Sequence, residues 1–114
     1  MPAESMYHPT TPEIADRRKG LAPRTHEAYE AFSAAVFADG ALSEQTKQLI
    51  AVAVAHTTQC PFCIRGHTRL ARRRGASDEQ IMEAIWVAAE MRAGGAYAHS
   101  TLALEELSHD PRRP

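Results

Sequence analysis

Apolar residues recur along this chain at the spacing of one helix face. Tyr29, Phe32 and Val36 stand three and four positions apart, which places them on one side of a helix. A second stripe with this spacing consists of Ile81, Met82, Ile85, Trp86 and Ala89. It predicts a helix whose apolar side is buried. We therefore expect five or six helices, within the ranges 12–19, 25–37, 43–56, 60–75, 77–93 and 96–107.

Capping and breaking residues mark the helix ends. Ser77, with Gln80 three residues later, forms a capping box at one helix start. Breaks are predicted where glycine or threonine interrupts the pattern, at Gly20, Thr57, Thr58, Gly94 and Gly95. Residues 50–55 alternate a β-branched residue with alanine, which also fits a strand. We prefer a helix there because Ser43 can cap it, the segment is long and no partner strand is evident.

The predicted fold is all-α, a compact bundle of five to six helices, because no strand–helix alternation is present. We expect a flexible N-terminal arm at residues 1–11, one helical domain at 12–108 and a disordered tail at 109–114, where two prolines stand. Alanine-rich helices that approach closely suit a homo-oligomer.

Charge and hydropathy narrow the function classes. The 114 residues include 13 basic and 14 acidic side chains, with a net charge of −1, which argues against a nucleic-acid binder. No apolar run approaches the ~20 residues of a membrane-spanning helix, and no signal peptide is evident. We therefore expect a cytoplasmic protein that does not act at a membrane. In that compartment a cysteine pair is more often redox-active or metal-binding than a permanent disulfide.

The candidate chemistry lies at Cys60 and Cys63, the two cysteines of the chain, with His67 four residues further on. At about 100° per residue, these three side chains share one face of a helix that begins at the cysteines. The other face carries Arg65, Arg69, Arg72 and Arg73. We interpret that arginine cluster as a solvated helix face rather than a binding surface.

Position on the helix predicts different roles for the two thiols. Cys60 stands at the helix start, where unpaired N–H groups and the helix dipole stabilise a thiolate, so we expect it to be the more acidic. Cys63, one turn later, is its partner in a disulfide, and His67 can relay a proton to or from Cys63.

Three segments carry a resemblance to a known family: residues 42–54, the motif Cys60–Cys63 with His67, and residues 91–105. They resemble the carboxymuconolactone decarboxylase family, specifically its alkylhydroperoxidase AhpD-like branch. The resemblance implies an all-α homotrimer or homohexamer, and we expect no cofactor or metal. It implies a peroxide or disulfide substrate, reduced with electrons from a thiol protein or a small dithiol. Cys63 would be the peroxide-attacking thiol, Cys60 the resolving or exchanging thiol and His67 the proton relay.

Two positions depart from the family pattern. Gln48 stands where the family has a relay glutamate, and an amide can accept a hydrogen bond but cannot take up a proton. Phe62 stands where the best-studied branch often has histidine. Glu90 and His99 are candidates for a substitute base. The simpler interpretations are a solvated glutamate and a histidine satisfied in a core or an interface.

Other functions stay open at this stage. The cysteines could be structural or redox-sensing in a non-catalytic helical oligomer, or the protein could be a decarboxylase-family enzyme for a small organic acid. A zinc site of Cys60, Cys63 and His67 with His56 or His99 fits poorly, because three ligands lie within two turns at one helix start.

Overall fold

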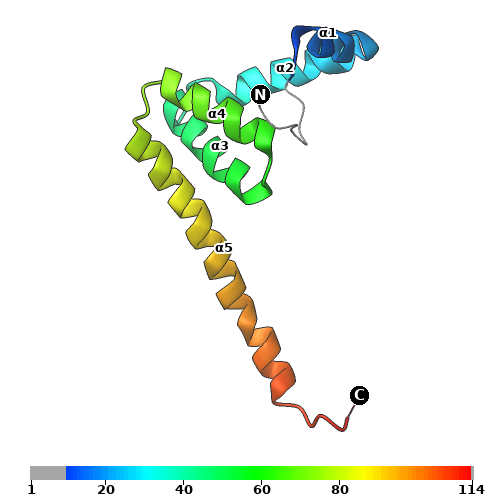
Figure 1. Ribbon diagram of the computed structural model, residues 1–114, viewed down its shortest axis with the longest axis vertical. Helices are drawn as coiled ribbons and strands as arrows, with labels where there is room; N and C mark the ends of the chain where they lie inside the picture. The colour runs from blue at the N-terminus through cyan, green and yellow to red at the C-terminus, as the bar shows by residue number, and fades with distance from the viewer. Residues whose placement is uncertain (1–9, 114) are drawn as a thin grey trace, which may run out of the picture. The chain divides into compact units, whose positions relative to one another are not determined.

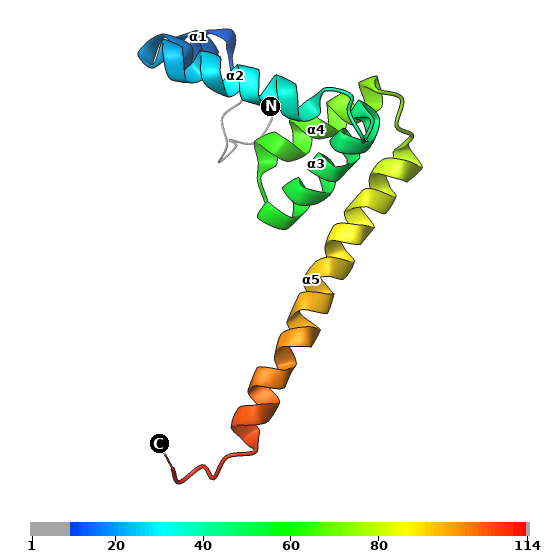
Figure 2. The same ribbon diagram turned by 180° about the vertical axis from the view of Figure 1, so that it is seen from behind.

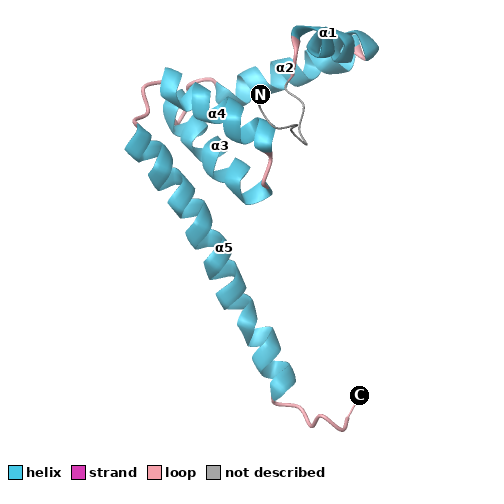
Figure 3. Ribbon diagram, viewed as in Figure 1, coloured by secondary structure: helices cyan, strands magenta, loops and turns pink. Residues whose placement is uncertain are grey.

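The computed structural model describes residues 10–113. Within that range all regular structure is helical and no strand is present (Figure 3). The helices, in chain order, are α1 (Pro12–Leu21), α2 (Pro23–Phe37), α3 (Glu44–Thr58), α4 (Pro61–Arg73) and α5 (Asp78–Leu107) (Figure 1). The expected all-α fold is confirmed. The described chain forms two compact units, which divide between Glu44 and Gln45.

The first unit contains α1 and α2. The hydroxyl of Thr11 caps α1 by accepting a hydrogen bond from the backbone N–H of Ile14 at 3.2 Å, as expected for a threonine before a helix. The predicted end at Gly20 was wrong by one residue, because the helix ends at Leu21. At Ala22 the backbone leaves the helical region, with φ −150° and ψ 69°, and Pro23 begins α2 two residues earlier than predicted.

In the second unit α3 and α4 lie side by side as a helical hairpin, in front and rear views alike (Figure 2). The expected break at Thr57 and Thr58 was wrong, since α3 continues to Thr58. Both hydroxyls donate to carbonyls of their own helix, Thr57 to Ala53 at 3.2 Å and Thr58 to Ala55 at 3.4 Å. These bonds satisfy side-chain groups that would otherwise compete with the helix.

α4 ends in a cap at Gly75, whose backbone has a φ of +90°. The N–H of Ala76 bonds to the carbonyl of Ala71 at 3.0 Å, the six-to-one bond of a Schellman cap. The side chain of Gln45, at the start of α3, donates to the carbonyl of Arg74 at 2.8 Å. The end of α4 is thus tied to the beginning of α3.

Replacing Gly75 with alanine is expected to lower the free energy of unfolding by about 1–2 kcal/mol. The new Cβ would require a left-handed backbone and would lie 3.3 Å from Nε2 of Gln45. The control is Gly66→Ala inside α4, where no atom lies within 4 Å of the new Cβ. That change should raise stability by up to about 1 kcal/mol. Urea denaturation of both variants measures the difference, and equal effects would contradict the assignment.

The core of this unit consists of small and β-branched residues. Val52, Ala71, Ala76 and Ile81 are buried together, and Leu49 and Ile85 pack against them. Val52 of α3 and Ala71 of α4 are both fully buried in this cluster, so the two helices pack against each other through it.

α5 begins at the predicted capping box. The hydroxyl of Ser77 accepts from the N–H of Gln80 at 3.1 Å, and the Gln80 side chain accepts from the N–H of Ser77 at 2.8 Å. The predicted interruption at Gly94-Gly95 was wrong, because α5 runs for 30 residues through both. Glycine keeps its backbone donor and acceptor, so each one costs a helix only about 1 kcal/mol.

Most of the predicted apolar stripe of α5 is not buried. Ile81 is buried and Ile85 is half-buried, but Met82, Ala89 and Trp86, which is 65% exposed, face solvent in the single chain. The prediction that this stripe is core was therefore wrong for those three residues. Large apolar side chains also stand exposed farther along α5, at Val87, Met91, Tyr97, Leu102, Leu104 and Leu107.

Other predictions concern the ends of the chain and the membrane. The predicted arm at 1–11 lies almost wholly outside the described residues. The division into arm, domain and disordered tail stays a prediction. At the C-terminal end, both side-chain oxygens of Asp110 accept hydrogen bonds from Arg112. Among residues 10–113, no helix is long and apolar enough to cross a membrane.

Candidate functional site

Cys60 lies at the joint between α3 and α4. Gln59 ends α3 in the left-handed region at φ 59°, and the N–H of Cys60 then bonds to the carbonyl of Ala55 at 3.2 Å. This is the six-to-one bond of a Schellman cap. The carbonyl of Cys60 accepts from the N–H of Ile64 at 2.9 Å, which starts α4. The C-terminal cap of one helix therefore fixes the residue that begins the next.

The sulfur of Cys60 is the N-cap group of α4. It accepts a hydrogen bond from the backbone N–H of Cys63, with 3.4 Å between N and Sγ. The side chain of Cys63 donates to it as well, and these two bonds, with one from the N–H of Phe62, hold the pKa of Cys60 below that of an ordinary thiol. Burial opposes the shift. Both cysteines are free thiols.

The pKa of Cys63 moves in the opposite direction. Its hydrogen bond to Cys60 raises the pKa, because Cys63 must keep its proton to donate it. Burial and the negative charge of the Cys60 thiolate raise it further. Of the two sulfurs, the one at the helix start is therefore the more acidic. This is the order of acidity that the sequence predicted.

His67 is held from the neighbouring helix. Its Nδ1 lies 2.8 Å from Oε1 of Gln48, which is only 2% exposed. Since an amide oxygen can only accept, this bond requires the proton to be on Nδ1. Burial lowers the pKa of His67, so the neutral ring is favoured. Nε2 is then the acceptor nitrogen of a neutral imidazole, one turn of α4 beyond Cys63.

Among the six predicted site residues, described contacts join Cys60 with Cys63 and His67 with Gln48. The other two, Glu90 and His99, form no described contact with them. His99 bonds through Nδ1 to the carbonyl of Gly95, in its own helix, at 2.7 Å.

The described residues offer no set of metal ligands. His56 bonds through Nδ1 to the carbonyl of Val52 at 2.7 Å. Across residues 10–113, no three histidine, cysteine, aspartate or glutamate side chains are grouped so that they could hold a metal ion. The zinc alternative therefore lacks its ligands in this part of the chain.

The sequence reasoning missed Arg92. Its guanidinium on α5 lies 3.4 Å from the carbonyl of Thr57, in the last turn of α3 and three residues before Cys60. The carbonyl end of a helix attracts cations, so an arginine on a following helix was a signal that could have been used. The contact links the middle of α5 to the last turn of α3.

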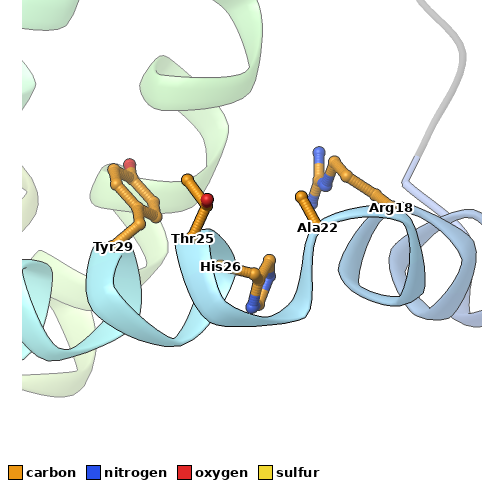
Figure 4. Close-up of a pocket in the computed structure, with 5 residues that line it drawn as sticks. All are labelled: Arg18, Ala22, Thr25, His26 and Tyr29. Carbon is orange, nitrogen blue, oxygen red and sulfur yellow. The ribbon is translucent and has the colours of Figure 1, made fainter.

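A separate hollow of about 490 Å³ lies in the first unit, lined by Arg18, Ala22, Thr25, His26 and Tyr29 (Figure 4). Nδ1 of His26 is buried there, 3.4 Å from Oε1 of Glu30 but without a hydrogen bond. Figure 4 shows Thr25 and Tyr29 on one side of α2 and the imidazole of His26 on another. The polar groups do not converge, so we assign no ligand to this hollow.

Comparison with known proteins establishes the family. The sequence profile of the carboxymuconolactone decarboxylase family matches residues 23–106. A protein of Paracoccus denitrificans, known as uncharacterized protein 4 in cox locus, is 70% identical over 81 residues, which are 71% of this chain and 73% of that protein. The chain belongs to the carboxymuconolactone decarboxylase family, as the sequence resemblance indicated.

Solved structures agree with this assignment. A crystal structure of a protein from Methanobacterium thermoautotrophicum has a TM-score of 0.72 at 34% identity, over 79% of this chain and 98% of that one. A carboxymuconolactone decarboxylase family protein from Legionella pneumophila has a TM-score of 0.65 at 33% identity, over 82% of both chains.

Proposed function

We propose that this protein is an AhpD-like thiol–disulfide oxidoreductase in which Cys60 and Cys63 cycle between dithiol and disulfide. The observation that carries the proposal is the hydrogen-bonded cysteine pair, with its more acidic thiol at the start of α4 and its second thiol one turn from His67. Thiol–disulfide exchange needs two thiols with different pKa values, because one sulfur attacks as a thiolate while the other keeps its proton.

Exchange with a partner disulfide proceeds in two steps. The Cys60 thiolate attacks one partner sulfur, the partner S–S bond breaks, and the released thiolate takes up a proton. Cys63 then gives its proton to Nε2 of His67 and attacks the sulfur of Cys60. This forms the Cys60–Cys63 disulfide and releases the second partner thiol. Two electrons pass to the partner, and a dithiol reverses the sequence.

A peroxide is the proposed alternative oxidant of the reduced cysteine pair, in place of a partner disulfide. By resemblance to the family, Cys63 attacks a peroxide oxygen after His67 accepts its proton, giving a sulfenic acid and an alcohol or water. Cys60 then attacks the Cys63 sulfur, water leaves and the disulfide forms. Because Gln48 cannot take a proton onward from His67, we expect disulfide exchange to be faster than peroxide turnover.

The test is a peroxide-reduction assay with dithiothreitol, coupled to mass spectrometry of the protein. The wild type should lose two thiols and about 2 Da on oxidation and regain them on reduction. Cys60→Ser and Cys63→Ser should each abolish the intramolecular disulfide. His67→Gln should slow its formation by about 10²-fold, the usual contribution of a positioned base.

The matched control is His99→Gln, because His99 bonds only to its own helix among the described contacts. It should leave the rate unchanged. Slow, equal alkylation of both wild-type thiols together with no reversible disulfide would refute the proposal.

We also propose that the chain works as a homotrimer or homohexamer. The support is the apolar surface of α5, where Trp86, Met91 and Tyr97 are exposed in the single chain. Light scattering after gel filtration measures the assembly, and a monomer would contradict this part of the proposal.

A further inference from the structure

The hairpin that carries the cysteines has a charge opposite to that of the rest of the chain. Residues 45–77 contain six basic side chains and no aspartate or glutamate. The whole chain has 13 basic and 14 acidic side chains, so the remaining residues hold seven basic and fourteen acidic ones. The net charge of −1 is therefore the sum of +6 over residues 45–77 and −7 over the rest of the chain.

Most of this positive charge lies on one face of α4, the arginine face, which consists of Arg65, Arg69, Arg72 and Arg73. All four are exposed. The one ion pair described for them joins Arg72 to Asp78 at 4.0 Å, between two well exposed side chains. Within residues 10–113 no ion pair is described for the other three. A surface pair of that length contributes little, so the face keeps most of its charge for a partner.

The arginine face begins near the Cys60 end of α4, although the thiol itself lies toward the other face of the helix. Helical spacing places Phe62, which is 51% exposed, on the same side of α4 as Arg65 and Arg69. Arg65 lies five residues, or about 7.5 Å of helix rise, from Cys60. That rise is within the Debye length of about 8 Å at physiological salt, so the charge of Arg65 acts on a partner that approaches this sulfur.

We propose that the arginine face of α4, with Phe62 at its Cys60 end, docks an acidic partner protein whose dithiol or disulfide exchanges with Cys60. The proposal rests on the redox function proposed above and names its partner class. An acidic surface would gain several charge-assisted contacts with guanidinium groups, and an apolar side chain beside its cysteines would cover Phe62. The same field would raise the rate of encounter.

The test uses two synthetic peptides with the same internal Cys-x-x-Cys disulfide, one flanked by glutamates and one by lysines. Stopped-flow measurements follow oxidation of the reduced protein by each peptide. At about 20 mM salt the glutamate peptide should react about 10- to 100-fold faster than the lysine peptide. At about 500 mM salt the two rates should converge.

Variants localise the effect. In the double variant Arg65→Glu with Arg69→Glu, the lysine peptide should oxidise the protein faster than the glutamate peptide. The control, Arg112→Glu with Arg113→Glu, changes the net charge equally and lies in the tail, so it should leave the order unchanged. Phe62→Ala should lower the rate of oxidation by the glutamate peptide at both salt concentrations, because the contact that Phe62 makes is not electrostatic.

Each outcome is decisive. Equal rates for both peptides at low salt would overturn the docking surface and leave the redox function intact. Failure of both peptides to oxidise the cysteine pair would overturn the redox function and the docking surface with it. If charge reversal on α4 changes the oligomeric mass but not the preference between peptides, the face binds a second copy of the chain and the proposal is wrong.

Discussion

Replacing Cys60 with serine is expected to remove the fast phase of alkylation and lower the observed rate by about 10- to 100-fold at neutral pH. The reason is that hydrogen bonds from Cys63 and Phe62 lower the pKa of Cys60, while Cys63 donates and keeps its proton. Iodoacetamide labelling followed by mass spectrometry measures the rate at each sulfur.

The pH dependence of this reaction has a defined sign. In the wild type, the rate at Cys60 should rise with pH and level off below the range of an ordinary thiol, because the thiolate forms early. Cys63→Ser keeps the backbone N–H that caps the sulfur, so it should retain a fast Cys60. The assignment is wrong if Cys63 is labelled first, or if both rates level off at the same pH.

Changing Gln48 is expected to alter the protonation of His67 without touching either sulfur. Gln48→Leu removes the acceptor of the Nδ1–H bond and should cost about 1–3 kcal/mol of unfolding free energy, because a buried donor loses its partner. Gln48→Glu replaces the amide with a buried carboxylate, which favours the imidazolium and should raise the pKa of His67. NMR titration of the imidazole measures both.

The wild type and Gln48→Glu should also differ in how the free energy of unfolding depends on pH. In the wild type, burial lowers the pKa of His67, so the unfolded state takes up a proton first and stability falls as pH drops below about 6.5. In Gln48→Glu the raised pKa reverses this. The histidine then contributes stability below about 6.5 that is lost as pH rises through its new pKa.

Disulfide formation should follow the same change. With Gln48→Glu its rate should rise at a higher pH than in the wild type, and it should be faster above the new pKa because the base is stronger. The control is Gln45→Leu, which breaks a different bond between the two helices, to the carbonyl of Arg74. It should lower stability and leave the titration of His67 unchanged. Equal effects of both substitutions on that titration would contradict the role of Gln48.

Local chemistry in the sequence was enough to predict the helices and the order of thiol acidity. The capping box at Ser77 and the proline after Cys60 act on residues at most three positions away. They can therefore be recognised from the sequence without knowledge of the fold. The bond between Gln48 and His67 spans 19 residues and depends on how α3 packs against α4. The sequence could indicate Gln48 only through the family resemblance.

The errors have a different origin. A stripe such as Met82 and Trp86 shows that one side of a helix is apolar, but not which element covers it. Within one chain, α5 extends beyond what α3 and α4 cover. The prediction that a helix ends at Gly94-Gly95 was wrong for another reason. Glycine ends a helix where its backbone adopts the left-handed conformation, and neither glycine has a positive φ.

The cap at Cys60 has a consequence for reduction potential. The hydrogen bonds from Cys63 and Phe62 to the sulfur stabilise the thiolate, which exists only in the reduced protein. Any interaction confined to the reduced state makes reduction more favourable and the disulfide a stronger oxidant. The Schellman cap at Gln59 fixes Cys60 as the N-cap residue of α4. It therefore favours a disulfide that oxidises a partner over one that persists as a structural bond.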